Sequence, residues 1–385
     1  MKGYLHKQGK YWYLLIDIGK DPRTGKRIRR NINTKCEKKS DARKVQAEIL
    51  TELNKGHFID KNSIAFSEYM LKWLEDYAKI NCETTTYEGY RIIIESHIVP
   101  YFKDLKLQEL RPAHIQQYYD YLVREGRKDG KGGLSASTIK RHHANIRKAL
   151  DRAVMLQLIP NNPALSVELP KVTKFKGKAY NIEQLKQLIE VSKGGPIHTA
   201  IMLASGLGLR RGEVCGLKWS HIDFEKGIVK IENTRTANGG VEVEKSTKTE
   251  KSNRTLSLPN YLKEYLKDLY KRQQKMKLLC GKGYNNSDYV CCWDDGTPVR
   301  PDYISKKFKE IIDKNSLPPI RFHDLRHTNA TLLLEQNVNI KWLSDWLGHS
   351  TIRTTADIYA HVTDKVLDEV ANKMDEVFSF STLNR

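Results

Sequence analysis

The segment RFHDLRHTNA, at residues 321–330, places two arginines, two histidines and an aspartate within seven positions. On a helix His323 and His327 share a face, and this is the spacing of the two histidine ligands in zinc hydrolases. His323 and Arg326 share a face equally well, because residues three apart on a helix also lie side by side. A cationic arginine between two histidines suits an anion better than a metal cation. The segment is therefore compatible with a metal site or with a phosphate site.

Two other segments carry polar residues with a chemical use. In LASGLGLRRGEVCGL, Arg210 follows a glycine-broken helix and opens another helix. An arginine beside a helix N-terminus is typical of an anion site, although a surface ion pair with Glu213 explains the same residues. In STKTEKSN, Lys248 and Lys251 lie on a turn between predicted strands. Lysines are common on exposed turns, so this segment alone indicates no function.

The segment KWLSDWLGHSTIRTTADIYAHV holds a second histidine and a tyrosine. His349 follows a glycine helix stop, and Tyr359 comes ten residues later. A single tyrosine near a C-terminus is usually a core or surface residue. Two other tyrosines of the same region, Tyr289 and Tyr303, do not follow an L-G-H segment.

The order of these motifs is more specific than any one of them. G-L-R-R-G-E, a lysine in a β-turn, H-x-x-R, L-G-H and a tyrosine about ten residues further on closely resemble the tyrosine recombinase family, to which phage lambda integrase belongs. The resemblance covers the whole chain and is strongest to integrases of conjugative transposons. It implies that the catalytic residues are Arg210, Lys248, His323, Arg326, His349 and Tyr359. Lys251 competes with Lys248, because the length of this turn varies among relatives.

The resemblance implies recombination of DNA through a 3′-phosphotyrosine. Arg210 and Arg326 would donate paired hydrogen bonds to the phosphate oxygens and supply the stabilisation that other enzymes obtain from a metal. No cofactor, metal or ATP is then expected. Tyr359, with an ordinary pKa near 10, would attack the phosphorus; His323 is the candidate base, or it only positions the phosphate. His349 would bind the phosphate, and the lysine would protonate the leaving 5′ oxygen.

Composition agrees with a nucleic-acid partner. The chain has 385 residues, enough for two or three domains, with 66 Lys+Arg against 46 Asp+Glu and a formal charge of +20. A charge of this sign indicates a polyanion, because neutralised phosphates release counterions; a merely soluble basic protein is the alternative. The six cysteines form no C-x-x-C pair, so neither disulfides nor a structural zinc is expected. We expect a cytoplasmic, nucleoid-associated bacterial protein without a membrane segment.

We expect a multidomain, mainly α fold with small β elements. Residues 1–62 predict a β-sheet packed on one helix that has Ser40 or Asp41 as its N-cap and stops at Gly56. Arg27 and Arg29 give one strand a basic face, as expected for an arm-type DNA-binding domain. The alternative is a small structural domain with solvated basic residues.

Residues 63–168 predict a helical core-binding domain of four helices. Ser135 or Ser137 caps the last of these, which carries five basic residues. These are Lys140, Arg141, Arg147, Lys148 and Arg152. Such a face is suited to DNA, although a charged helix face is often only solvated; we single out Lys140, Arg141 and Arg147 as DNA contacts. The proline- and lysine-rich residues 161–179 predict a linker.

Residues 175–385 predict a mixed α/β, mostly α, catalytic domain. Asn238-Gly239 is a hairpin signal within its β-section. The apolar stripe of residues 362–378 either caps its own domain or, as the resemblance implies, docks on a neighbouring protomer. The implied partners are double-stranded DNA at core and arm sites, three further copies in a homotetramer, an excisionase and a DNA-bending accessory protein.

Three rival functions fit part of the sequence. A metalloprotease needs a third ligand and leaves the charge unexplained. A non-catalytic DNA-binding regulator explains the charge but not the ordered motifs. A topoisomerase would share the chemistry, and only the arm-like N-terminal module argues against it.

Overall fold

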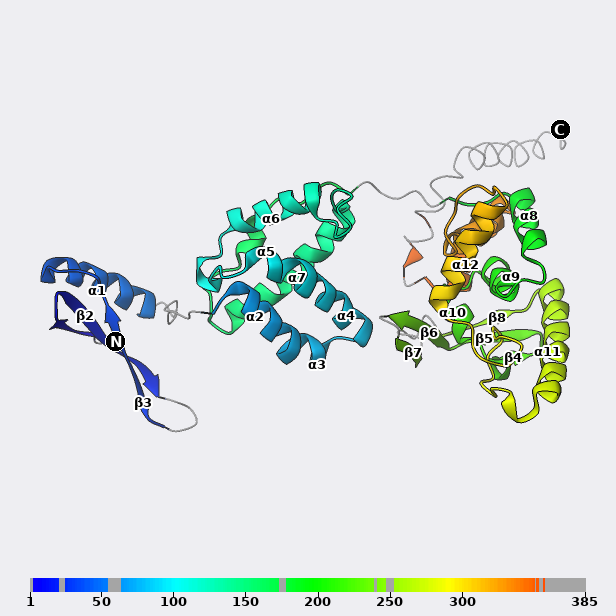
Figure 1. The fold of residues 1–385 in the computed structure, drawn as a ribbon, viewed down its shortest axis with the longest axis horizontal. Helices are drawn as coiled ribbons and strands as arrows, with labels where there is room; N and C mark the ends of the chain where they lie inside the picture. The colour runs from blue at the N-terminus through cyan, green and yellow to red at the C-terminus, as the bar shows by residue number, and fades with distance from the viewer. Residues whose placement is uncertain are drawn as a thin grey trace, which may run out of the picture. The chain divides into compact units, whose positions relative to one another are not determined.

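The computed structural model divides the chain by its contacts into two compact units, Met1–Thr173 and Lys174–Arg385. Figure 1 shows a mainly helical chain with small β-sheets, in agreement with the fold class expected from the sequence. The described residues are 3–20, 25–54, 64–172, 178–238, 241–246, 253–349, 351–352 and 356. No helix among them is long and apolar enough to cross a membrane.

The first unit begins with a three-stranded antiparallel sheet in the order β1-β2-β3. The strands are β1 (Gly3–Gln8), β2 (Tyr11–Lys20) and β3 (Arg27–Asn33). Helix α1 (Lys39–Asn54) packs on β1 and β2 over the buried Leu14 and Ile16. The expected sheet and helix are present, with β1 as an added strand. Helix α1 begins at Lys39, so Ser40 and Asp41 lie in its first turn and neither is the N-cap that the sequence predicts. Gly56 lies outside the described residues.

Four helical segments form the rest of this unit, as the sequence predicts. Two of them contain a π-helical turn. The first consists of α2 (Phe66–Trp73), the turn η1 (Leu74–Ala78) and α3 (Lys79–Asn81). The second consists of α4 (Thr84–Ile93), the turn η2 (Ile94–Ile98) and α5 (Val99–Phe102). The other two are α6 (Pro112–Glu125) and α7 (Ala136–Met155). Ser135 is the N-cap of α7, since its side chain accepts a hydrogen bond from the Thr138 amide. This cap was one of the two that the sequence predicts.

Helix α7 sends its basic residues in two directions. Lys140, Arg141 and Arg147 are exposed. Lys148 instead lies 5.7 Å from the ring centre of Tyr77, and the Arg152 guanidinium lies 4.8 Å from the same ring. Lys140, Arg141 and Arg147 are therefore the exposed basic residues of this helix, while the cations of Lys148 and Arg152 pack on an aromatic ring.

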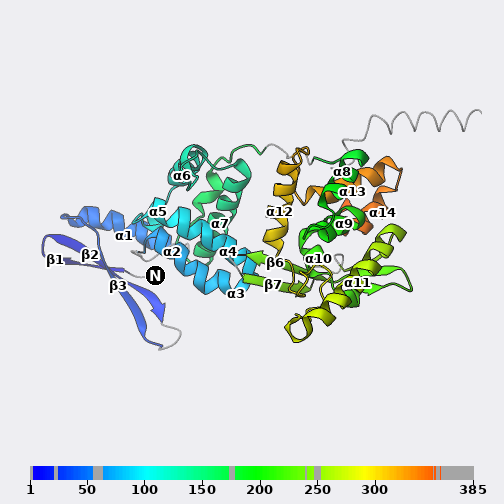
Figure 2. The ribbon, with the colours of Figure 1, turned by 45° about the vertical axis from the view of Figure 1, so that its right-hand side comes forward.

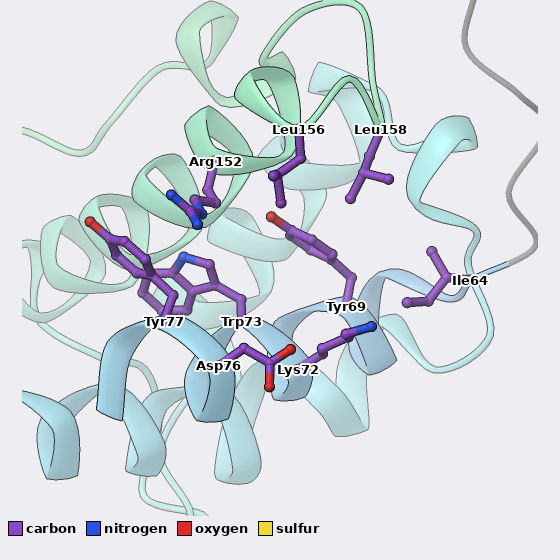
Figure 3. Close-up of a pocket in the computed structure, with 9 residues that line it drawn as sticks. All are labelled: Ile64, Tyr69, Lys72, Trp73, Asp76, Tyr77, Arg152, Leu156 and Leu158. Atoms are coloured by element: carbon purple, nitrogen blue, oxygen red, sulfur yellow. The ribbon is translucent and has the colours of Figure 1, made fainter. Parts of the chain in front are cut away.

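A cavity of about 430 Å³ lies beside this contact (Figure 3). It is lined mainly by apolar and aromatic side chains of α2, η1 and the end of α7, among them Tyr69, Trp73 and Leu156. None of the six predicted catalytic residues lines it, whereas Arg152 of the basic helix α7 does.

The predicted linker starts later than residue 161. Asn162 is buried, and its side chain bonds the Arg147 carbonyl, the Asp151 carboxylate and the Ala164 amide. The following turn η4 (Pro163–Ser166) packs on α6 and α7. These contacts make the segment part of the helical domain, because its polar groups are satisfied by α7.

The second unit surrounds one large hydrophobic core with helices. Figure 2 labels these helices, and Figure 1 labels the strands beside them. The helices are α8 (Ile182–Ser192), α9 (His198–Leu207), α10 (Arg211–Gly216), α11 (Asn260–Cys280), α12 (Pro301–Lys314), α13 (Asp324–Glu335) and α14 (Ile340–Leu347).

Within the described part of the second unit, five strands form two sheets. They are β4 (Ile222–Asp223), β5 (Ile228–Ile231), β6 (Asn233–Asn238), β7 (Val241–Ser246) and β8 (Arg254–Ser257). Strands β6 and β7 pair around the predicted Asn238-Gly239 turn. Strand β8 pairs with β5 and not with β7. The lysine-rich segment between β7 and β8 therefore joins strands of different sheets and closes no hairpin.

Candidate active site

Arg326 lies in the first turn of α13 and is buried, with 3% of its surface exposed. Its Nη1 donates to the Gly208 carbonyl at 2.8 Å, and its Nη2 donates to the Leu347 carbonyl at 2.6 Å. It therefore joins the turn after α9 to the end of α14. Burial, with the charge of Arg210 second, lowers its pKa to about 9, so the guanidinium remains charged at neutral pH.

Arg210 is the N-cap of α10 and forms the expected ion pair with Glu213. Glu213 Oε1 accepts from Arg210 Nη1 at 2.7 Å, and Oε2 accepts from the Arg210 amide at 3.0 Å. Arg210 Nη2 also donates to the Gly348 carbonyl at 2.9 Å. The side chain of Arg210 is 36% exposed, while that of Glu213 is 1% exposed. The arginine is thus anchored by a buried carboxylate and still reaches solvent, so the ion pair and the anion site coexist.

The turns after α9 and α14 meet through two glycines in the left-handed conformation. Gly208 has φ 63° and Gly348 has φ 65°. A Cβ on Gly208 would lie 2.5 Å from Cδ2 of Leu347, and one on Gly348 would lie 3.0 Å from Nη1 of Arg254. Both the backbone angle and the close approach disfavour a side chain at these positions. The two glycines therefore allow the turns to bring Arg210 and Arg326 together.

The two candidate histidines lie beside these arginines. His349 directly follows Gly348, and its pKa is lowered to about 3 by burial first and then by the charges of Arg326 and Arg210. His323 is the N-cap of α13; desolvation first, then His327 and Arg326, lowers its pKa to about 4. Both rings are therefore neutral at pH 7 and able to accept a proton or a hydrogen bond.

The other polar residues of HDLRH have structural partners. Asp324 is 1% exposed and accepts from Arg321 Nη2 at 2.7 Å and Nε at 3.0 Å. The ring of His327 lies edge-to-face against that of His323, with centroids 5.5 Å apart. This agrees with a structural role for His327.

A cavity of about 560 Å³ opens next to this group. Arg210 and His323 both line it. Three more basic residues share its wall, namely Arg211, Lys309 and Arg321. No group of three metal-ligating side chains occurs among the residues that the structure describes. A cationic cavity of this kind suits a phosphate, and the anion interpretation of RFHDLRHTNA is the one that the geometry favours.

Arg254 is a site residue that the sequence analysis missed. It opens β8, and its Nη1 and Nη2 donate to the two oxygens of Glu213 at 3.2 and 2.9 Å. Its Nε donates to the Trp346 carbonyl at 2.8 Å. An arginine in a short strand after a lysine-rich segment carries no local signal of such contacts. The one available signal is that a charged residue stands in a strand where an apolar residue would be expected to pack.

The structure brings together four of the six predicted catalytic residues, namely Arg210, His323, Arg326 and His349. Lys248, its competitor Lys251, and Tyr359 lie outside the described residues. The predicted docking helix after Tyr359 lies outside them as well.

Arg210 lines a cationic cavity, and the buried Arg326 donates to the Gly208 and Leu347 carbonyls beside it, on a chain with a charge of +20. This arrangement is typical of an enzyme that acts on the phosphates of a polyanion. Comparison with known proteins narrows this class. Residues 179–366 match the model of the phage integrase family, and residues 65–123 match the phage integrase N-terminal SAM-like domain. The chain belongs to the phage integrase family of tyrosine recombinases, and its activity is site-specific DNA strand transfer.

Relatives match along nearly the whole chain. A "Tyrosine recombinase XerC-like" protein of Caldanaerobacter subterraneus subsp. tengcongensis is 29% identical over 97% of this chain and 98% of its own. The ICEBs1 integrase of Bacillus subtilis is 27% identical over 94% of this chain and 96% of its own. Among solved structures, the Tn1549 transposon integrase with transposon right end DNA has a TM-score of 0.67 at 19% identity, covering 81% of this chain and 99% of that one.

Proposed function

We propose that this chain is the integrase of a mobile element, which inserts and excises the element by cutting and rejoining double-stranded DNA through a bond between a 3′ phosphate and Tyr359. The named integrases among its relatives, of ICEBs1 and of Staphylococcus phage L54a, support the link to mobile elements. The observation that carries the proposal is the convergence of Arg210, Arg326 and His349 on the turn at the end of α14.

In the proposed reaction the phenol oxygen of Tyr359 bonds to the scissile phosphorus, and the bond from phosphorus to the 5′ oxygen breaks. Arg210 and Arg326 stabilise the charge that builds on the non-bridging oxygens. Each guanidinium has five N–H donors, so it can bind the phosphate while it keeps its carbonyl contacts. His349 donates or accepts a hydrogen bond at the phosphate. Arg210 and Arg326 are held by protein carbonyls before DNA arrives, so little reorganisation is needed during the reaction.

Two protons have to move in this step. The phenol of Tyr359 loses one, and a neutral His323 can accept it or can orient the phosphate while solvent accepts it. The leaving 5′ oxygen gains one from Lys248, with Lys251 as the alternative. A 5′ hydroxyl of another strand can then attack the phosphotyrosine and reverse the step, which completes an exchange without ATP.

We assign DNA contacts outside the site to exposed basic residues. Arg27 and Arg29 on β3 suit arm sites, and Lys140, Arg141 and Arg147 on α7 suit the core site. These assignments follow the proposed domains, an arm-binding domain at 1–62, a core-binding domain at 63–168 and a catalytic domain at 175–385.

We also propose that four copies assemble on DNA in the bacterial cytoplasm, on the nucleoid, with an excisionase and a DNA-bending protein as accessory partners. A related lambda integrase is a tetramer on a Holliday junction, with a TM-score of 0.57 at 19% identity. This relative supports assembly; the accessory proteins rest on the family resemblance alone.

The proposal predicts a covalent protein–DNA adduct. Incubation of the full chain with a nicked core-site duplex in the presence of EDTA should trap an adduct that survives denaturing electrophoresis. Tyr359→Phe should abolish the adduct and keep DNA binding, because only the nucleophilic oxygen is lost. Tyr303→Phe, at a half-buried tyrosine of α12, is the matched control and should form the adduct normally. A normal adduct yield from Tyr359→Phe would refute the assignment.

A further inference from the structure

The last three carbonyls at the end of α14 each accept a hydrogen bond from a different arginine. Trp346 O accepts from Arg254, Leu347 O from Arg326 and Gly348 O from Arg210. The carbonyls at a helix C-terminus lack partners within the helix and carry partial negative charge, so three guanidiniums fit this end of α14.

We propose that Arg254 is a positioning residue of the recombinase, which fixes Arg210 through the shared Glu213 carboxylate and fixes the turn that carries His349 through the Trp346 carbonyl. The inference rests on the proposed function, since it concerns the same site. It assigns to Arg254 no contact with DNA.

The orientation of Arg254 separates it from the other two arginines. Its side chain is 7% exposed, and its Nε, Nη1 and Nη2 all donate to protein acceptors. The side chain of Arg210, by contrast, is 36% exposed and lines the cationic cavity. Arg254 therefore faces Glu213 and α14, while Arg210 faces the space available to a phosphate.

Glu213 is the link between the two arginines. It is the N3 residue of α10, and both of its oxygens accept from Arg210 and from Arg254. Burial acts to raise the pKa of Glu213, and the hydrogen bond and charge of Arg254, followed by those of Arg210, outweigh it and lower the pKa. An ionised Glu213 holds the Arg210 side chain in one orientation, so a loss of Arg254 would reach Arg210 through this carboxylate.

Arg254 also connects the site to the segment that carries the candidate general acid. Lys248 and Lys251 precede it by six and three residues, and Arg254 is the first residue of β8 after them. The hydrogen bonds of Arg254 to Glu213 and to the Trp346 carbonyl therefore hold the chain in place directly after both lysines.

The test compares Arg254→Met, Arg254→Lys and Glu213→Gln in the full chain, measuring the single-turnover rate of adduct formation on a nicked core-site duplex and DNA affinity by gel shift. Arg272→Met, at an exposed arginine of α11, is the control for charge loss. Removing a donor that contacts the developing charge costs about a hundredfold in rate. Arg254→Met only disturbs the orientation of such a donor, Arg210, so we expect it to slow adduct formation by about tenfold or more. DNA affinity should stay within about twofold, because the proposal assigns Arg254 no contact with a DNA phosphate.

A pH profile distinguishes positioning from a general loss of structure. In Arg254→Met the pKa of the buried Glu213 should rise, so that adduct formation falls more steeply as the pH is lowered. Glu213→Gln/Arg254→Met lacks the titrating carboxyl and should lose this added pH dependence. The loss caused by Arg254→Met should also be smaller in the Glu213→Gln background than in the wild-type chain, because the two residues act through one contact.

Each outcome bears on the inference. Arg254→Lys keeps the charge but cannot reproduce the paired contacts, so it should also form the adduct slowly while binding DNA, and it decides the case if Arg254→Met does not fold. A wild-type rate of adduct formation in Arg254→Lys would overturn this inference and leave the proposed function intact. The same holds if Arg254→Met loses the same fraction of its rate at every pH and its effect is additive with that of Glu213→Gln. Absence of an adduct from the wild-type chain would overturn the proposed function as well.

Discussion

At the scale of single residues, this site is built from cations that are satisfied by backbone oxygens. Arg326 is almost fully buried, and both of its Nη atoms donate to carbonyls. Arg210 and Arg254 share the carboxylate of Glu213, while Arg326 donates to carbonyls. Burying a cation costs stability unless opposite charge is near. Under the proposed function, a phosphate bound here would bring additional negative charge to these arginines.

The first prediction at this scale concerns His349. In the free protein its ring should stay neutral far below its usual pKa, since burial and the charges of Arg326 and Arg210 lower the pKa to about 3. Binding of DNA should raise this pKa, because the phosphate opposes the charges of both arginines. The measurement is an NMR titration of the imidazole with and without a core-site duplex, with the resonance assigned by His349→Gln. Free protein that titrates near 6.5 would contradict it.

The same shift has a consequence for stability. The unfolded chain binds a proton at His349 near pH 6.5, while the folded chain does so only near the lowered pKa. The unfolded state therefore holds more protons between these two values, and the free energy of unfolding decreases as the pH falls through this window. Denaturant unfolding should show a weaker pH dependence in His349→Gln than in the wild-type chain.

At the scale of elements, the ends of helices determine the site. Helices α9 and α14 both end at a left-handed glycine, and α10 and α13 both begin with a predicted catalytic residue at the N-cap. Helix ends suit this purpose because their unpaired backbone groups can bind side chains from other elements. The short turns after α9 and α14 therefore matter more for the arrangement than the lengths of the helices.

The prediction at this scale is that Gly348→Ala destabilises the protein and slows adduct formation. A residue with a Cβ is strained at φ 65° by about 1–2 kcal/mol, and this Cβ would also lie 3.0 Å from Arg254 Nη1. Gly194→Ala is the matched control: Gly194 has φ 70°, and a Cβ there would meet nothing within 4 Å. Equilibrium unfolding should show a loss in both variants, with adduct formation slowed only in Gly348→Ala. Equal rates in the two variants would show that the contact with Arg254 is unimportant.

At the scale of the whole molecule, the described residues form separate hydrophobic cores. Leu14 and Ile16 form the core of the N-terminal sheet, while the helical domain and the second unit each have a core of their own. The exposed arginines of β3 belong to the N-terminal sheet, and they are far along the chain from the catalytic motifs. Changes to one set of residues should therefore leave the chemistry of the other intact.

The prediction at this scale is that Arg27→Glu/Arg29→Glu, in the full chain, loses binding to arm sites and retains adduct formation on a core-site duplex. Charge reversal repels DNA phosphates and should also reduce the salt dependence of arm-site binding. Arg43→Glu/Lys44→Glu, at exposed positions of α1, applies the same change of charge to the helix and is the control. Footprints over the ends of the element would measure both. Unchanged arm-site protection would argue for a structural role of the sheet.

Much of the site could be read from the sequence because its signals are local. The N-cap position of Arg210, the glycine stop before His349 and the Ser135 cap depend on residues within a few positions of each other. The ordered motifs also sufficed for the family. Such features are decided by backbone geometry and hydrogen bonds inside one turn, so they depend little on the tertiary structure.

Tertiary structure alone decided the features that depend on distant residues. Arg254 meets Glu213 across 41 residues and Trp346 across 92, and no periodicity or spacing encodes such a contact. The pairing of β8 with β5, and the inward turn of Lys148 and Arg152 on α7, likewise depend on which surfaces the fold buries. A charged side chain follows the partners that packing places beside it, and for this reason the third arginine of the site became visible only in the folded chain.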